Sequence, residues 1–210
     1  MDKVVIVGAG VAGINAATKL VDNNYKGQIT IIDMGKDPYN RLPEEVMKGM
    51  LGAGGFSDGK LTYHTSIGGQ LSKYCGEEKA MGLFDEVIAN FKRFHPNPSE
   101  VQCSDPQAEP EFIKPYFGLR LFPVWHIGTD YLHQIGKNWY DYLVENGVEF
   151  IWETKVTDID FKKQECKCKG DMFNTRYQGL QYDKLIFGVG KSGIDFGKKL
   201  AEQYDLPTEP

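Results

Sequence analysis

The chain has 210 residues, 41% of them hydrophobic, so it can bury a substantial core and is not a disordered tail. With 24 Lys and Arg against 29 Asp and Glu the net charge is -5, which gives no electrostatic basis for binding nucleic acid or an acidic membrane. The N-terminus carries no basic segment followed by a long apolar one, and no run approaches the ~18 apolar residues of a membrane span. We therefore expect a cytoplasmic protein whose partner is a small molecule or another protein.

The first predicted element is a buried parallel strand over residues 3–7, because this short run is rich in β-branched residues. Gly8, Gly10 and Gly13 follow it in the G-x-G-x-x-G spacing and lead into a predicted helix. Gly8 permits a tight turn, Gly10 lets a pyrophosphate approach the backbone, and Gly13 lets the helix pack closely on the strand. The phosphates of a bound dinucleotide would then lie at the N-terminus of this helix.

The context of the glycines strengthens the dinucleotide hypothesis. The predicted helix spans residues 11–22, and a second strand over residues 28–32 ends at Asp33, which lies 20 residues beyond Gly13. A carboxylate at this position accepts hydrogen bonds from a ribose hydroxyl and would repel the 2′-phosphate of NADP. The alternative is an ordinary glycine-rich turn of an α/β protein.

A second glycine-rich stretch covers residues 51–62, with four glycines among residues 52–59 and with Ser57, Asp58 and Lys60 nearby. This composition predicts a backbone that lies very close to a flat or charged group. The alternative is a flexible surface loop, with Ser57 and Asp58 bonding to their own backbone amides.

Hydrophobic periodicity predicts the remaining elements. A helix over residues 77–94 is followed by a connector between domains, rich in proline and acidic residues, at 95–114. The other predicted elements are strands within 116–127, a helix that ends at 146–147, strands at 147–152 and 154–159, a hairpin at 164–178, a strand at 184–187 and a helix at 192–204.

The four cysteines, Cys75, Cys103, Cys166 and Cys168, have no C-x-x-C spacing, so the sequence predicts neither a zinc site nor a vicinal redox disulfide. Cys166 and Cys168 share one face of a predicted strand whose flanking lysines suggest a solvated hairpin edge.

The glycine fingerprint, with Ala17 four residues beyond Gly13, resembles the FAD-binding form of the glutathione-reductase-like flavoproteins. The run at 52–61 resembles the G-G-A-G-x-x-S-D-G-K-L signature of the FAD-dependent dehydrogenase family (NAD(FAD)-utilising dehydrogenases), and residues 126–130 and 188–193 match it further. The chain departs from that signature at Leu51, where the first glycine is expected. It also lacks the upstream cysteines of many members, so the resemblance implies no thiol chemistry.

This resemblance implies an α/β fold, with a Rossmann-like FAD-binding domain and a partial α+β substrate-facing domain. The expected ranges are 1–95 for the FAD-binding region, 96–180 for the substrate-facing region, and 181–210 for a return strand and helix. The cofactor-binding residues that the spacing and the resemblance together indicate are Gly8, Gly10, Val11, Ala12, Gly13, Asp33, Met34, Lys36, Gly54, Gly55, Ser57, Lys60, Val156, Gly188 and Gly190.

Residues 188–193 repeat the G-x-G-x-x-G spacing, which would suggest a second nucleotide site. Only 17 residues remain beyond Gly193, too few for the helix, strand and acidic residue that the fingerprint needs. The resemblance instead implies a turn at which the chain leaves the flavin domain. It also places the end of this sequence near the middle of the resembled proteins, so we expect either an N-terminal half or a short relative.

The expected function is that of a FAD-dependent oxidoreductase of unknown substrate, with a nicotinamide cofactor or a protein as electron partner. Lys60 is a candidate to lie near the flavin, its alternative being a solvent-exposed lysine. His126 is a candidate acid or base, its alternative being a structural histidine. Two other functions stay open: a non-catalytic FAD- or ADP-binding module, and an NAD-linked dehydrogenase that uses the N-terminal fingerprint.

Overall fold

The structure is a computed structural model that describes residues 2–106, 112, 116–170 and 179–208. The chain forms two compact units, Met1–Phe56 with Gly136–Pro210, and Ser57–Ile135. These boundaries differ from the expected ranges 1–95, 96–180 and 181–210, because a strand at 149–151 pairs within the sheet of the first unit. None of the helices in the described part of the chain combines the length and apolar character needed to cross a membrane.

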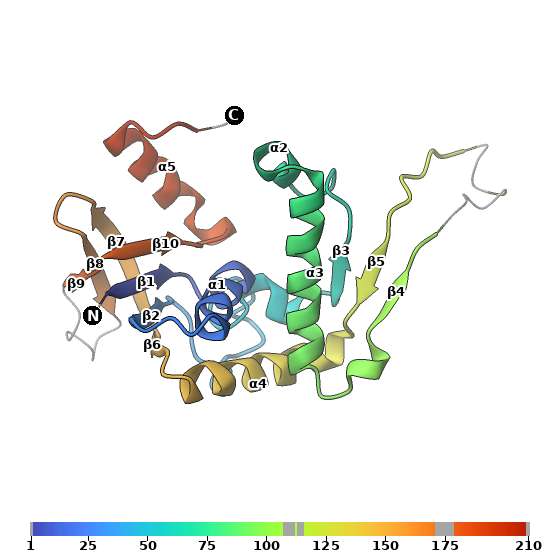
Figure 1. Ribbon diagram of the computed structural model, residues 1–210, viewed down its shortest axis with the longest axis horizontal. Helices are drawn as coiled ribbons and strands as arrows, with labels where there is room; N and C mark the ends of the chain where they lie inside the picture. The colour runs from blue at the N-terminus through green and yellow to red at the C-terminus, as the bar shows by residue number, and fades with distance from the viewer. Residues whose placement is uncertain (1, 107–111, 113–115, 171–178, 209–210) are drawn as a thin grey trace. The chain divides into compact units, whose positions relative to one another are not determined.

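The centre of the first unit is a four-stranded parallel sheet with strand order β10-β1-β2-β6 (Figure 1). The strands are β1 (Lys3–Val7), β2 (Gln28–Ile32), β6 (Glu149–Ile151) and β10 (Lys184–Phe187). Helix α1 (Val11–Asp22) connects β1 to β2 and has the predicted bounds. The chain thus has the predicted α/β fold with a Rossmann-like parallel sheet.

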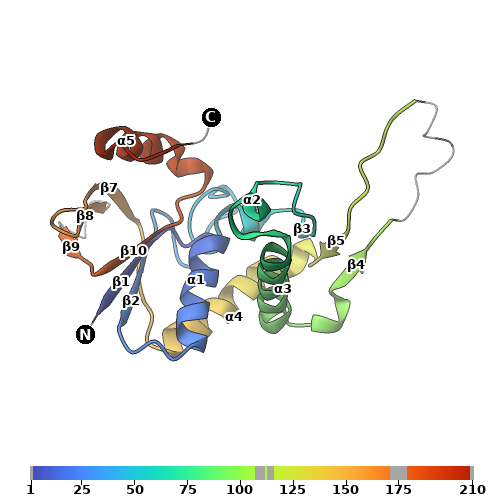
Figure 2. The same cartoon turned by 45° about the horizontal axis from the view of Figure 1, so that its top comes forward.

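The two faces of this sheet are covered by different elements. Val5, Val7 and Ile32 belong to a core shared with a three-stranded antiparallel sheet and with α5 (Ile194–Tyr204), which Figure 2 shows in red. The antiparallel strands are β7 (Thr154–Asp160), β8 (Glu165–Gly170) and β9 (Gly179–Gln181). Because side chains alternate along a strand, Ile6 lies on the opposite face, where it meets Gly13 of α1.

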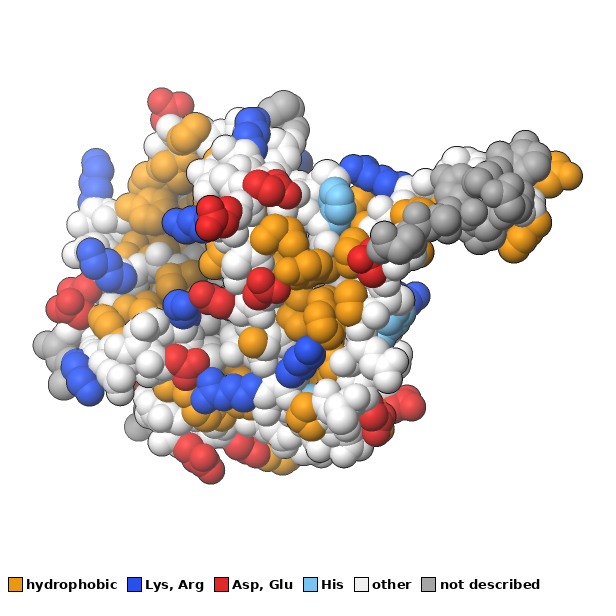
Figure 3. Space-filling view, turned by 45° about the vertical axis from the view of Figure 1, so that its right-hand side comes forward, with side chains coloured by type: hydrophobic (Ala, Val, Ile, Leu, Met, Phe, Trp, Pro, Cys, Tyr) orange, Lys and Arg blue, Asp and Glu red, His pale blue; other side chains and the backbone are white. Residues whose placement is uncertain are grey.

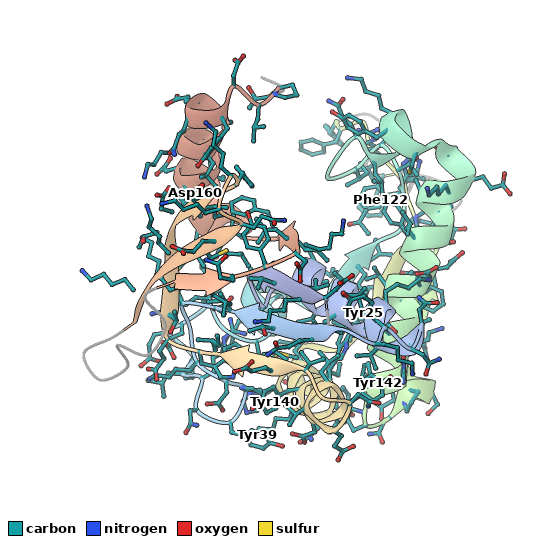
Figure 4. All side chains as sticks on the ribbon, turned by 60° about the vertical axis from the view of Figure 1, so that its left-hand side comes forward. Tyr25, Tyr39, Phe122, Tyr140, Tyr142 and Asp160 are labelled. Atoms are coloured by element: carbon teal, nitrogen blue, oxygen red, sulfur yellow. The ribbon has the colours of Figure 1, made fainter. Side chains whose placement is uncertain are left out.

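Helix α4 (Leu132–Glu145) supports α1 through a buried polar contact. The Trp139 indole N–H donates to Thr18 Oγ1 at 2.7 Å, and both residues are fully buried. On the outer side of α4, Tyr140 meets Tyr39 edge to face, with ring centroids 6.2 Å apart (Figure 4). Ile135, Trp139 and Leu143 are fully buried, so one face of this helix is a core face.

The second unit contains a small antiparallel sheet of order β3-β5-β4, built from Lys60–Thr62, Val124–His126 and Gln102–Ser104. Helices α2 (Leu71–Cys75) and α3 (Glu77–Phe94) belong to the same unit. Buried His95 follows α3, where its Nε2 bonds to the Ile127 carbonyl at 2.9 Å and its Nδ1 accepts the Asn97 N–H at 2.8 Å. These two bonds of His95 fix the direction of the chain after α3.

Several expected elements need correction. Within the predicted strands at 116–127 only Val124–His126 pairs, and the connector at 95–114 contains strand β4. The stretch at 51–62, for which a flexible surface loop was the alternative, contains a 3₁₀ turn and strand β3, because residues 60–62 find partners in β5. In the hairpin expected at 164–178, residues 165–170 form β8, which pairs antiparallel with both β7 and β9, and residues 171–178 lie outside the described part of the chain.

The solvated edge expected around Cys166 is also wrong. Cys166 is fully buried in the core beneath α5, and half-buried Cys168 packs against the same core. The lysines that flank these cysteines occupy the alternate, outward positions of β8, so the local sequence looked more polar than the buried face is. Elsewhere on the surface, charged side chains of both signs are interspersed, as Figure 3 shows for one face.

Candidate functional site

The first unit contains a cavity of about 660 Å³ at the carboxyl ends of the parallel strands. Val7, Ile32 and Phe187, the last residues of β1, β2 and β10, line it together with the start of α1. In open α/β sheets, ligands bind in the crevice at this end of the strands. The volume lies within the range of about 300 to 1,000 Å³ typical of small-molecule sites.

The glycines of the first turn have two different roles, close packing of the backbone and access of a ligand to it. A Cβ on Gly13 would lie 2.0 Å from the Gly8 carbonyl oxygen, and a Cβ on Gly8 (φ +106°) would lie 2.4 Å from the Gly188 carbonyl oxygen. A Cβ on Gly10 would meet no described atom within 4 Å. Gly8 and Gly13 therefore close the turn, whereas Gly10 leaves open space along the cavity wall.

Helix α1 begins directly at Gly10, which takes an extended conformation (φ -69°, ψ 177°). No side chain of the described residues caps the helix, and Val11, Ala12 and Gly13 add no acidic group to its first turn. Its free N–H groups and positive dipole end therefore favour an anion in the cavity.

Asp33 lines the cavity, but its carboxylate is engaged with the backbone. Its Oδ2 accepts the Ala9 N–H at 2.8 Å, and its Oδ1 accepts the N–H groups of Gly35 and Gly49, each at 2.7 Å. These three bonds join the first glycine turn to the segment after β2. Because a carboxylate offers about four lone-pair sites, one remains for a ligand hydroxyl.

Residues 47–54 form another wall of the cavity, and buried Arg41 holds this segment from behind. Arg41 makes five hydrogen bonds to the carbonyl oxygens of Glu45, Val46, Met50 and Gly52. Burial lowers the pKa of Arg41 to about 10, against the opposing effect of the Asp33 and Glu45 charges, so the guanidinium stays protonated at neutral pH.

The second glycine turn lies beside the first and lines the same cavity. The Gly188 N–H donates to the Val7 carbonyl at 2.8 Å, and Gly188, Val189 and Gly190 line the cavity. Val156, near the start of β7, lines it as well. The two G-x-G-x-x-G sequences thus contribute to one cavity.

The charged residues that line the cavity are three lysines, Lys48, Lys155 and Lys191, and two acids, Asp33 and Asp195. Lys48 also lies 3.5 Å from a Glu45 carboxylate oxygen. The cavity thus combines an open helix N-terminus with nearby cations, which suits a phosphate-bearing ligand with apolar parts.

Most of the residues indicated by the sequence converge on this cavity. Those that line it are Gly8, Gly10, Val11, Ala12, Asp33, Met34, Gly54, Val156, Gly188 and Gly190. Gly13 packs against the turn instead, and Lys36 lies 3.8 Å from Glu45 in an ion pair. A Cβ on Gly55 would lie 2.5 Å from Arg41 Nη1, so this glycine gives space to the arginine.

Ser57, Lys60 and His126 belong to the second unit and do not line the cavity. Ser57 Oγ accepts the Gly59 N–H at 3.2 Å, and Lys60 forms an ion pair with Asp58 at 3.1 Å. His126 is exposed on β5, where its Nε2 lies 2.5 Å from Ser104 Oγ. All of these bonds are local to the second unit.

Sequence reasoning missed Arg41, the buried side chain that holds the 45–52 segment from behind the cavity wall. Its surroundings, Tyr39, Asn40, Leu42 and Pro43, resemble an exposed loop, and nothing in their pattern indicates burial. The available signal was the density of glycines that follows, because Gly49 and Gly55 both leave room for the arginine: a Cβ on Gly49 would lie 3.3 Å from Arg41 Cδ.

Comparisons with known proteins agree with this architecture. Residues 2–97 match the model of the family described as pyridine nucleotide-disulphide oxidoreductase. No match was found among curated protein sequences.

Two solved structures share the fold. A flavoprotein/dehydrogenase from Cytophaga hutchinsonii is 17% identical with a TM-score of 0.52, and the alignment covers 100% of this chain and 43% of that one. A glycine oxidase from Bacillus cereus is 12% identical with a TM-score of 0.54, covering 98% of this chain and 59% of that one. The chain therefore spans roughly half the length of these proteins, and at this identity the likeness concerns the fold.

Proposed function

We propose that the chain binds FAD through the cavity of its first unit and forms part of a FAD-dependent oxidoreductase whose substrate is unknown. The observation that carries the proposal is the convergence of both glycine turns, the end of β2 and the start of β7 on one cavity at the N-terminus of α1. The family match over residues 2–97 and the flavoprotein among the structural neighbours support it.

The open space at Gly10 fits a pyrophosphate, because that position alone in the first turn leaves the backbone accessible. In this proposal the N–H groups at the start of α1 hold the pyrophosphate, and Asp33 uses its remaining lone pair for a ribose hydroxyl. Val156 borders the adenine side. The second glycine turn closes the cavity near the same phosphates.

Bound FAD would supply hydride or electron transfer, and the residues of this chain would bind and orient it and exclude water. The apolar side chains of Val11, Leu51, Val156 and Phe196 line the cavity and would shield the ligand from solvent. The electron partner is proposed to be a nicotinamide cofactor or a protein. An acidic residue at position 33 favours NADH over NADPH if such a cofactor binds here.

A second candidate function is that of a nucleotide-binding module without catalysis. It is favoured by one observation, namely that the chain spans only 43% of the Cytophaga flavoprotein and 59% of the glycine oxidase. In this alternative the chain binds FAD or ADP but transfers no electrons by itself.

Titration of the purified protein with FAD, ADP and NADH distinguishes these functions. We expect FAD and ADP to bind to one shared site, with mutual competition, and FAD to shift its visible spectrum on binding. Reduction of the bound flavin by NADH would support the oxidoreductase, and binding without reduction by any donor would support the module. NADH binding in the absence of FAD binding would contradict the proposal.

A further inference from the structure

Buried Arg41 does not line the cavity, yet it bonds only to carbonyl oxygens of the segment that does. The Nη2 atom lies 2.6 Å from the Gly52 oxygen and 3.0 Å from the oxygens of Glu45 and Val46. The Nη1 atom bonds to the Met50 oxygen. The guanidinium plane also lies over the Phe56 ring, 4.4 Å from its centroid, which fixes its orientation.

These bonds determine where the opposite sides of the same peptide groups point. In a trans peptide the N–H is antiparallel to the C=O, and the described chain contains no cis peptide bond. The N–H groups that follow the bonded carbonyls, those of Val46, Met47, Leu51 and Ala53, therefore point away from Arg41. Met47, Leu51 and Ala53 all line the cavity.

One of these donors is already used, and two are free for a ligand. The Leu51 N–H donates to the Ala9 carbonyl at 2.8 Å. The N–H groups of Met47 and Ala53 have no acceptor within residues 2–106, 112, 116–170 and 179–208. Met47 and Ala53 are exposed, so their N–H groups are open to water, and a bound acceptor group would take the place of that water.

The oriented segment lies directly against the first glycine turn. Gly10 and Leu51 form a parallel β-bridge, and a Cβ on Gly52 would lie 3.4 Å from Gly10 Cα. On its other edge the segment is fixed by the Gly49 N–H, which donates to Asp33 at 2.7 Å. Arg41 thus binds the carbonyl side of this segment and Asp33 binds one of its amides, and the segment lines the same cavity as the start of α1.

We infer that Arg41 is a positioning residue for phosphate recognition: it orients the peptide groups of residues 45–53 so that the Met47 and Ala53 N–H groups receive the pyrophosphate opposite the start of α1. This inference rests on the proposed function, since it assigns a role within the same nucleotide site. A lysine would replace Arg41 only in part, because an ammonium offers three donors from one atom, whereas the planar guanidinium reaches several carbonyls in one fork.

The test compares a ligand with two phosphates and the same ligand without them, ADP and adenosine, on the unaltered protein and on Arg41→Met and Arg41→Lys. We expect Arg41→Met to weaken ADP binding at least about tenfold, the effect of losing a hydrogen bond to a charged group, and to change adenosine binding less than about twofold. Arg41→Lys should be intermediate. Methylguanidinium added to Arg41→Ala should restore part of the ADP affinity.

The matched control is Thr18→Val, which removes a buried bond to Trp139 in the same unit without touching the cavity wall. It should lower stability while leaving the ratio of ADP to adenosine affinity unchanged. Amide exchange provides a second measurement: ADP should slow exchange at Met47 and Ala53 in the unaltered protein and in Arg41→Lys far more than in Arg41→Met.

Equal losses of ADP and adenosine affinity in Arg41→Met would overturn the inference, since they would mean that the arginine only stabilises the fold. Unchanged ADP affinity would overturn it as well. If the unaltered protein binds neither ADP nor FAD, the proposed function fails and this inference fails with it. ADP binding by the unaltered protein, together with equal binding by Arg41→Met, would reject the inference alone.

Discussion

The two glycine turns, at residues 8–13 and 188–193, have the same G-x-G-x-x-G spacing but different surroundings. The first connects β1 directly to α1, with Gly10 as the N-terminal residue of the helix. The second connects β10 to a 3₁₀ turn, Lys191–Gly193, before α5 begins. Helix α1 leads to the neighbouring strand β2 and to Asp33, whereas α5 lies over the antiparallel strand β7.

This difference between the two turns shows that the G-x-G-x-x-G spacing indicates only the local backbone geometry. The elements that follow a turn decide whether it binds a ligand. In the first turn Gly13 packs directly against the Gly8 backbone, and Gly10 has no side chain that would occupy the cavity. In the second turn an added Cβ on Gly188 would meet only ordinary contacts, the nearest at 3.5 Å, and one on Gly193 would lie 2.3 Å from the Val189 side chain rather than from the backbone of the turn's first glycine. We therefore expect the first turn to bind the ligand directly and the second to complete the cavity wall.

The largest expected effect is that of Gly10→Val on ligand binding. The valine side chain would project into the cavity, so FAD and ADP affinity should fall by at least about 1,000-fold, or about 4 kcal/mol. The free energy of unfolding should change by no more than about 1 kcal/mol, because the protein leaves space around Gly10. Calorimetric titration and urea unfolding measure the two effects.

Gly190→Ala is the matched change in the second turn, since a Cβ there also meets no described atom within 4 Å, although its φ of +58° strains an alanine. It should weaken ligand binding far less than Gly10→Val. Equal losses of binding in the two variants would mean that the two turns contact the ligand alike.

The next largest effect concerns packing within the turns. Gly13→Ala places a methyl group 2.0 Å from the Gly8 carbonyl oxygen, so the backbone must shift, and the unfolding free energy should fall by about 3 kcal/mol. Gly188→Ala should cost less than about 1 kcal/mol. Thermal unfolding of both variants without ligand makes the comparison, and similar melting temperatures would contradict it.

Asp33→Ala should have a smaller effect, divided between stability and binding. Loss of the three backbone bonds should lower the unfolding free energy by about 2 kcal/mol, and loss of the ribose contact should weaken FAD binding by about 1 to 3 kcal/mol. Glu202→Ala, on α5, is the control, because Glu202 is exposed and does not line the cavity. Its effects on stability and binding should both be under about 0.5 kcal/mol.

The smallest expected effect is a dependence of stability on alkaline pH, which arises in the core beneath the second turn. Burial raises the pKa of Cys166 to about 12, of Cys168 to about 11 and of Tyr182 to about 12. The unfolded chain releases these protons at ordinary pKa values of 9.0 for cysteine and 10.0 for tyrosine. The unfolded chain therefore binds fewer protons than the folded chain above pH 9. The free energy of unfolding should fall as the pH rises from about 9 to about 12.

The slope should be at most about 1.4 kcal/mol per pH unit for each titrating group, and smaller for Cys168, which is only half-buried. Urea unfolding at several pH values between about 8 and 11 measures it. In Cys166→Ala the slope should decrease, because one of the titrating groups is absent. A steeper slope in that variant would contradict the assignment.

The sequence by itself determined the elements that depend on local pattern. The bounds of β1, α1 and β2 agree with the predicted ranges, because a β-branched run, glycines at fixed spacing and a polar turn act within a few residues. The patterns that predict the helix at 77–94 and the strand at 184–187 are equally local. Pro96 and Pro98 follow the end of the helix. The indication that Gly10 faces a ligand also came from spacing alone.

Only the tertiary structure decided which distant segments share the cavity. Asp33 and the second glycine turn acquire their roles through partners that are brought close by strand pairing, such as that of β1 with β10 across most of the chain. The burial of Cys166 likewise depends on α5, which no local signal near residue 166 reveals. Hydrophobic period and turn chemistry encode the conformation of a segment, whereas the partner of a buried charge or thiol is set by the packing of elements far apart in the sequence.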